Sequence, residues 1–198
     1  MNHAAHTWIV AVILGLLAMS TATAHAGTTP EEVKAFEGYK ALAEKGDRVA
    51  QYNLGNSYLN GKGVAKNDAH AVLWYRKAAE QGFTYAQTNL GFRYFNGNGV
   101  AKDQGEAVKW YMKSAHQGDA VAQFLLGNCY HEGKGVAKDE IEAYAYWVLA
   151  GSSNRAARTE ISNLEKQMSG DQIVAGKKRA MELQKEIDAK IAAKAAGK

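Results

Sequence analysis

The chain has 198 residues, of which 46% are hydrophobic and 22% are charged, and its formal net charge is +4. This composition excludes a wholly disordered chain, and the small net charge does not by itself indicate a nucleic-acid-binding protein. Twenty glycines beside a single proline favour recurrent tight turns between helices over a proline-rich linker.

Residues 1–26 differ from the rest of the chain because they contain no Asp, Glu, Lys or Arg. The apolar stretch from Trp8 to Met19 is long enough for the hydrophobic region of a signal peptide but short for a membrane span. Small residues follow it and end in an Ala-x-Ala site, so we expect cleavage after Ala26 and a periplasmic or secreted protein. The alternative is an uncleaved anchor, since no Lys or Arg precedes the apolar stretch.

Residues 27–46 are interpreted as an N-terminal cap that corresponds to half of a repeat. The segment from Phe36 to Gly46 (FEGYKALAEKG) matches the second half of the repeats that follow it. In that alignment Tyr39, Ala43 and Gly46 correspond to Tyr75, Ala79 and Gly82.

Three segments of equal length follow: residues 47–82, 83–118 and 119–154. They align without a gap and share eleven identical positions. A fixed period of 36 residues indicates a repeat architecture. The identical positions are Ala50/Ala86/Ala122, Gln51/Gln87/Gln123, Leu54/Leu90/Leu126, Gly55/Gly91/Gly127, Tyr58/Tyr94/Tyr130, Gly61/Gly97/Gly133, Gly63/Gly99/Gly135, Val64/Val100/Val136, Ala65/Ala101/Ala137, Lys66/Lys102/Lys138 and Ala71/Ala107/Ala143.

The first half of each repeat predicts a helix, which we call helix A. Ala50, Leu54 and Tyr58 fall on one helical face in the first repeat. Gly55 lies inside this helix, where glycine costs about 1 kcal/mol relative to alanine, so its repetition predicts a neighbouring helix in very close contact. The pair Gly61 and Gly63 then ends the helix, because glycine readily adopts the left-handed conformation.

The second half of each repeat predicts another helix, helix B. Asn67, Asp103 and Asp139 are good N-cap residues, and the latter two have Glu106 and Glu142 at the spacing of a capping box. An aromatic pair follows in each copy, and one member of each pair should pack between helices. One hairpin cannot bury its own apolar stripe, so the repeats must stack. The pairs are Trp74-Tyr75, Trp110-Tyr111 and Tyr146-Trp147.

Residues 155–198 predict two capping helices, one over about Arg155 to Met168 and one starting near Gly170. The second carries an apolar stripe that fits the open end of the core, and it should fray after about Ile191. We interpret this basic helix as a solvated cap; attraction to anionic lipid or cell wall and a partner helix are the alternatives. The acidic residues interleaved with the basic ones argue against a dedicated membrane binder. The stripe consists of Ile173, Ala180, Leu183, Ile187 and Ile191.

The motif A-x-x-x-L-G-x-x-Y-x-x-G-x-G-V, the aromatic pair and K-A-A-x-Q-G resemble the Sel1-like repeat (SLR) family, relatives of the tetratricopeptide repeats. The resemblance covers Phe36 to Asn154, and the segment from Leu164 to Gln172 resembles the tail of many bacterial members. It implies an all-α fold, a right-handed α-solenoid with a concave face, in an adaptor protein of the cell envelope. The third repeat departs from the pattern at its end, where Leu149 to Ser153 replace K-A-A-x-Q-G.

In such solenoids the side of helix A that faces away from helix B lines the concave groove. On that side this chain places aromatic residues, which supply contact area, and asparagines, which hydrogen-bond an extended peptide backbone. We therefore predict a partner-binding groove there; the alternative is that some of these aromatics fill the core or meet the terminal helix. The groove residues are Tyr52, Asn56, Asn60, Tyr85, Phe92, Phe95, Asn96, Phe124, Asn128 and His131.

No catalytic, metal or cofactor site is expected. The sequence GKGVAK lacks the P-loop spacing, and neither H-E-x-x-H nor a Cys/His cluster occurs. Cys129, the only cysteine, excludes an intramolecular disulfide, and we expect it to be buried rather than reactive. It lies two residues from His131 on helix A, so the two side chains point to different faces and do not form a nucleophile–base pair.

We therefore expect a non-catalytic scaffold that binds a protein or peptide partner in the cell envelope, acting as a regulator or inhibitor, with no nucleic acid and only weak contact with the cell wall. Two alternatives remain open. One is an enzyme of cell-wall or β-lactam chemistry like the cysteine-rich relatives, which the missing paired cysteines disfavour. The other is a structural protein that assembles end to end.

Overall fold

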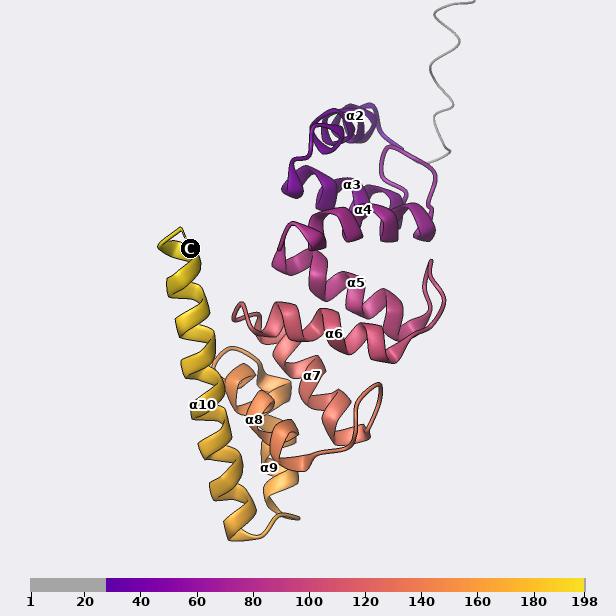
Figure 1. The fold of residues 1–198 in the computed structure, drawn as a ribbon. Helices are drawn as coiled ribbons and strands as arrows, with labels where there is room; N and C mark the ends of the chain where they lie inside the picture. The colour runs from indigo at the N-terminus through magenta and orange to yellow at the C-terminus, as the bar shows by residue number, and fades with distance from the viewer. Residues whose placement is uncertain (1–27, 198) are drawn as a thin grey trace, which may run out of the picture.

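The computed structural model describes residues 28–197, which form nine helices and no strand (Figure 1). The expected signal peptide, residues 1–26, lies outside the described residues. The helices are α2 (Pro30–Glu44), α3 (Arg48–Asn60), α4 (Asp68–Glu80), α5 (Thr84–Asn96), α6 (Gln104–Ala115), α7 (Ala120–Glu132), α8 (Glu140–Ala150), α9 (Arg155–Glu165) and α10 (Gly170–Ala195).

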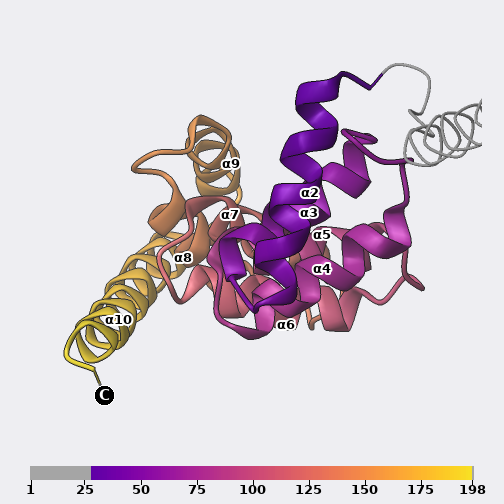
Figure 2. The same ribbon diagram turned by 90° about the horizontal axis from the view of Figure 1, so that it is seen from above.

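The helices stack in chain order. Each helix from α2 to α8 packs on the next one in the sequence, and α10 returns along the stack to pack on α8. Helices α3, α5 and α7 are the predicted helices A, and α4, α6 and α8 are the predicted helices B. Figures 1 and 2 show α10 lying along one side of this stack. The all-α solenoid of repeats predicted from the sequence is therefore confirmed.

The glycine inside each helix A has the predicted close neighbour. A Cβ atom on Gly55 would lie 2.7 Å from Tyr75 Cδ1, and one on Gly127 would lie 2.4 Å from Trp147 Cδ1. One aromatic residue of each helix B thus packs directly against the backbone of its own helix A, and alanine does not fit there.

The two glycines of each loop have separate tasks. Gly61, Gly97 and Gly133 end helix A in the left-handed conformation. Gly63, Gly99 and Gly135 also have positive φ, and they lie directly on the preceding helix B or its equivalent. The loops therefore connect the repeats to each other as well as the two helices of one repeat.

The predicted N-caps are confirmed, but the predicted capping boxes are wrong in one of their two bonds. The side chains of Asp103 and Asp139 accept hydrogen bonds from the backbone N–H groups of Glu106 and Glu142. The reciprocal bonds are not made within the described chain, because the Glu106 carboxylate pairs with Lys109 and the Glu142 carboxylate with Arg179. Complete capping boxes occur instead at the starts of α2 and α10.

The invariant glutamine of helix A connects successive repeats through a hydrogen-bond ladder. Gln87 Nε2 donates to the Ala79 carbonyl oxygen at 3.0 Å, and Gln87 Oε1 accepts from Gln117 Nε2 at 2.7 Å. Gln51 makes the same pair of bonds with Ala43 and Gln81. The helix before the first repeat, α2, thus accepts the same glutamine hydrogen bond that a helix B accepts from the repeat after it.

We expect the substitution Gln87→Ala to lower the free energy of unfolding by about 1–3 kcal/mol, because a buried carbonyl group and the Gln117 amide both lose a partner. Gln123→Ala is the matched control. Gln123 donates to Ala115 at 3.2 Å, but Ser153 stands where a second glutamine would complete the ladder. Its loss should be smaller by about 1 kcal/mol. Equal losses in urea unfolding would contradict the ladder's role.

The two C-terminal helices close the stack. On α10, Ala180, Leu183 and Ile187 are buried as predicted, whereas Ile191 is about half exposed. The helix does not end near Ile191 but continues to Ala195. Arg179 Nε donates to Glu142 Oε1 at 2.6 Å and thereby attaches α10 to the start of α8.

Candidate functional site

The exposed side of the three helices A carries most of the predicted groove residues, and we call this surface the helix A face. Tyr85 on α5 is 63% exposed and Phe92, two turns further along α5, is 44% exposed. Val49 and Val121, which stand at the position of Tyr85 in the other repeats, are exposed as well. Large exposed apolar side chains on one face indicate a contact surface.

An aromatic cluster forms the part of this face between the first two repeats. The Tyr52 ring lies 5.2 Å from the Phe83 ring and 6.3 Å from the Tyr85 ring, measured between ring centroids. Asn89 Nδ2 is 3.4 Å from the Tyr52 hydroxyl. Phe83 was not among the predicted residues. The signal for it was that phenylalanine replaces the aspartate found at this position in the other two repeats.

Two of the predicted asparagines are held by the aromatic residues of helix B. The Tyr75 hydroxyl donates to Asn56 Oδ1 at 2.6 Å, and Trp147 Nε1 donates to Asn128 Oδ1 at 3.0 Å. Within residues 28–197, the Nδ2 groups of both asparagines have no hydrogen-bond acceptor. Each asparagine therefore offers a fixed donor, which suits the carbonyl group of an extended peptide.

Asn60 and Asn96 lie at the ends of their helices and are exposed. Each donates its Nδ2 group to the backbone of its own helix at 2.9 Å, Asn60 to Asn56 and Asn96 to Phe92. These bonds leave the side-chain oxygens as acceptors at the edge of the helix A face.

Two predicted residues have structural partners instead. Phe124 packs with the cluster of Tyr144 and Trp147 that also receives Ile161 of α9, so it belongs to the terminal core. This packing corresponds to the alternative stated in the sequence analysis, in which some of the aromatic residues fill the core or meet the terminal helix.

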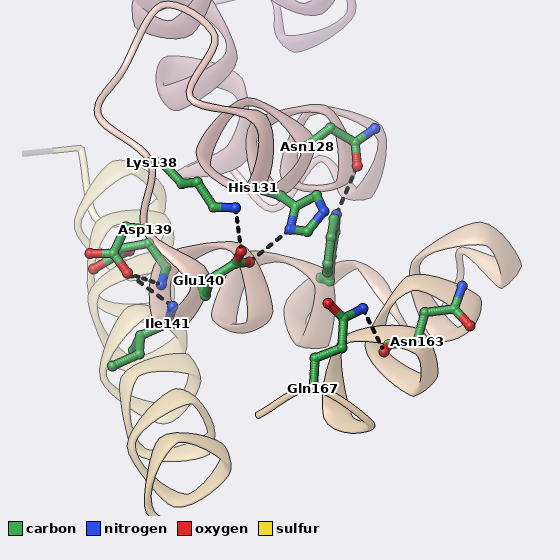
Figure 3. A network of polar contacts seen from close by, with 10 residues as sticks. Asn128, His131, Lys138, Asp139, Glu140, Ile141, Asn163 and Gln167 are labelled. Atoms are coloured by element: carbon green, nitrogen blue, oxygen red, sulfur yellow. Dashed lines mark hydrogen bonds and ion pairs between the residues drawn. The ribbon is translucent and has the colours of Figure 1, made fainter. Parts of the chain in front are cut away.

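His131 belongs to a network that joins the end of α7 to the start of α8 (Figure 3). Its Nδ1 atom lies 2.7 Å from Glu140 Oε2, and Lys138 Nζ donates to Glu140 Oε1 at 2.8 Å. Burial acts to raise the pKa of Glu140, but the bonds from Lys138 and His131 together keep this pKa below its usual value. The His131 ring also packs on the Trp147 ring, with 5.3 Å between centroids.

A cavity of about 190 Å³ opens between α5, α6 and α7 beside the helix A face. Burial raises the pKa of the Cys129 thiol in its wall to about 12, so this thiol is protonated and unreactive at neutral pH. The predicted residues Phe92, Phe95, Asn96 and Asn128 come together here with residues that sequence reasoning missed. The missed lining residues are Tyr111, Leu125, Glu132 and Lys134.

A larger cleft of about 760 Å³ lies between the C-terminal half of α10 and the edge formed by the turns between repeats. Lys190 and Lys194 of α10 reach across it to His116 Nδ1 at 3.1 Å and Gln117 Oε1 at 2.8 Å. Burial and the charge of Lys190 both lower the pKa of His116. Nothing in the sequence indicated this cleft, because it depends on the path of α10.

Two kinds of feature are missing from the described part of the chain. Residues 28–197 contain no group of three or more His, Cys, Asp or Glu side chains placed to hold a metal ion. None of the helices over the same residues has both the length and the hydrophobicity needed to span a membrane.

Comparisons with known proteins agree with this architecture. The family model for the Sel1 repeat matches residues 48–83, 84–119 and 120–154, together more than half of the chain. Each match begins one residue later than the repeats defined from the sequence. No curated protein has significant similarity to the chain.

The solved structures that are similar to the chain include the following two. The crystal structure of a Sel1 repeat protein from Oxalobacter formigenes has a TM-score of 0.60 and 40% sequence identity, with 64% of this chain and 96% of that chain covered. The crystal structure of c5321, described as a protective antigen present in uropathogenic Escherichia coli strains with an SLR fold, has a TM-score of 0.68 and 26% identity. That match covers 80% of this chain but only 34% of the c5321 chain.

Proposed function

Because the chain belongs to the Sel1 repeat family, whose members are typically non-enzymatic protein–protein interaction scaffolds, we propose that it binds a protein or peptide partner along the helix A face. We further propose that it is exported by its N-terminal segment and acts in the cell envelope, as a regulator or inhibitor of its partner.

The observation that carries this proposal is the combination of exposed aromatics and held asparagines on one face. Tyr85 and Phe92 supply apolar contact area, and aromatic side chains are frequent hot spots of protein interfaces. Asn56 and Asn128 present donors whose orientation is fixed from behind by helix B. A partner therefore meets these donors without first having to order them.

Site-specific photocrosslinking in the native bacterium tests the proposal. With the full-length chain, we expect a crosslinker at Tyr85 or Phe92 to capture one dominant envelope protein. A crosslinker at Leu73 of α4, which is also exposed and apolar but belongs to a helix B, should not capture it. The double substitution Tyr85→Ala and Phe92→Ala should weaken binding at least about tenfold, with unchanged helical content.

Three results would count against the proposal. The first is equal capture from Leu73, and the second is capture of this chain alone, which would favour the self-assembling alternative. The third is turnover of a chromogenic β-lactam or of peptidoglycan by the purified protein, which would favour the enzymatic one.

A further inference from the structure

The junction between repeats 1 and 2 and the junction between repeats 2 and 3 are built from equivalent residues, with two differences. Asn56 in the first repeat corresponds to Phe92 in the second. Arg93 in the second repeat corresponds to Cys129 in the third. The repeats thus provide an internal comparison of how each junction is filled.

At the first junction the tyrosine of helix B is fully satisfied. The Tyr75 hydroxyl donates to the amide oxygen of Asn56 at 2.6 Å. Burial raises the pKa of Tyr75, and the positive charge of Arg93 opposes this rise. The carboxamide of Asn56 thus lies directly beside the hydroxyl.

At the second junction both of these groups are missing. Tyr111 corresponds to Tyr75 and is only 1% exposed, but Phe92 stands where Asn56 accepts from the Tyr75 hydroxyl, so the equivalent carboxamide is missing. The cavity of about 190 Å³ lies at this place, with Tyr111 and Cys129 in its wall. The Tyr111 hydroxyl is not among the fully buried polar atoms that lack a partner, so it keeps some accessible surface. A group that enters the cavity from outside can therefore accept a hydrogen bond from it.

We propose that this cavity is an anchor pocket for one neutral side chain of the partner polypeptide, with an apolar stem and a carboxamide tip as in glutamine. The carboxamide oxygen would accept from the Tyr111 hydroxyl, as the Asn56 oxygen does from Tyr75. The inference rests on the proposed function, since the partner's backbone would lie on the helix A face.

Size and charge both select this occupant. The volume is below the range of about 300–1,000 Å³ for small-molecule pockets, so it suits one side chain rather than a whole ligand. Phe92, Phe95 and Leu125 supply apolar walls for the stem. A buried carboxylate would need a cation, but Lys134 at the rim is already paired with Glu132.

The rim of the cavity also carries hydrogen-bonding groups for the partner's backbone on either side of the anchoring side chain. Asn128 lines the cavity and has its Nδ2 donor directed by the bond from Trp147 to its oxygen. Asn96 also lines the cavity, and its side-chain oxygen is left as an acceptor. A donor and an acceptor at the mouth match the carbonyl and N–H groups of an extended segment.

Fragment binding tests the pocket independently of any partner. The probes are butyramide, which reproduces the glutamine side chain, and butyrate, its charged counterpart. In an NMR titration of the chain from Gly27, we expect butyramide to shift signals of residues around Tyr111 and Cys129. Butyrate should bind at least about tenfold more weakly. Equal binding of the two probes, or no shift with butyramide, would overturn the proposal.

Two variants and one control fix the location. Cys129→Leu fills the cavity, and Phe92→Asn gives Tyr111 the partner that Tyr75 has; each should abolish the butyramide response. Cys129→Ser keeps the volume and should retain it. The spectrum of each variant reports its fold, and Phe92→Asn remains informative if the leucine is not accommodated. An unchanged response in a folded Phe92→Asn or Cys129→Leu variant would place the fragment elsewhere and refute the pocket.

The two proposals fail in different ways. If a partner crosslinks to Tyr85 while butyramide does not bind, the anchor pocket is wrong and the proposed function stands. If butyramide binds as expected but no polypeptide crosslinks to the helix A face, the pocket exists and the proposed function is wrong.

Discussion

The substitution Gly135→Ala should lower the free energy of unfolding by about 2–5 kcal/mol. Gly135 has φ of 75°, a conformation that costs about 1–2 kcal/mol for a residue with a side chain. Its added Cβ would also lie 2.1 Å from the backbone oxygen of Gln104, at the start of α6. Overpacking of this kind costs typically about 1–3 kcal/mol, and backbone atoms have little freedom to move away.

The matched control for this prediction is two residues away in the same loop. Gly133 has φ of 67°, but a Cβ there would meet nothing closer than Lys138 Cβ at 3.4 Å. Gly133→Ala should therefore show only the conformational cost of about 1–2 kcal/mol. Urea unfolding followed by circular dichroism measures both variants. If the two variants lose the same stability, the contact between the loop and the preceding repeat is not the reason for the second glycine.

Features that recur in all three repeats were predictable, because three copies record the same local requirement three times. Gly55 was predicted to face a close neighbour from its position alone, and the Tyr75 ring lies there. The N-caps at Asp103 and Asp139 followed from local rules that involve only the next three residues.

Features that depend on non-repeated partners were not predictable in the same way. The Glu142 carboxylate does not complete the predicted capping box because it pairs with Arg179 of α10. Phe124 packs against the cluster that Tyr144 and Trp147 of α8 form with residues of α9. Both outcomes are set by the C-terminal helices, whose path no periodicity describes.

The cavity at the second junction was only partly predictable from the sequence. Its residues stand at varied positions of the repeat, and the change from Arg93 to Cys129 was visible in the alignment. The sequence did not show that these positions face the preceding helix B and its tyrosine.

The C-terminal helix should be as important to stability as any helix of the repeats, and Leu183→Ala tests this. Leu183 is fully buried between α10 and the stack, so its truncation should cost about 2–5 kcal/mol. Met181, on the same helix, is 65% exposed, and Met181→Ala should change stability by no more than about 0.5 kcal/mol. Thermal unfolding of the two variants gives the comparison, and similar melting temperatures would mean that α10 is not an integral part of the core.

The Leu183→Ala variant also tests which of two surfaces binds the partner, the helix A face or the cleft beside α10. Because α10 packs on α8, loosening it should change the basic cleft at Lys190 and Lys194 while Tyr85 and Phe92 keep their places on α5. Capture of the partner by a crosslinker at Tyr85 should therefore be the same in Leu183→Ala as in the unaltered chain, at a temperature where both are folded. A loss of capture in the folded variant would transfer the binding function from the helix A face to the cleft beside α10.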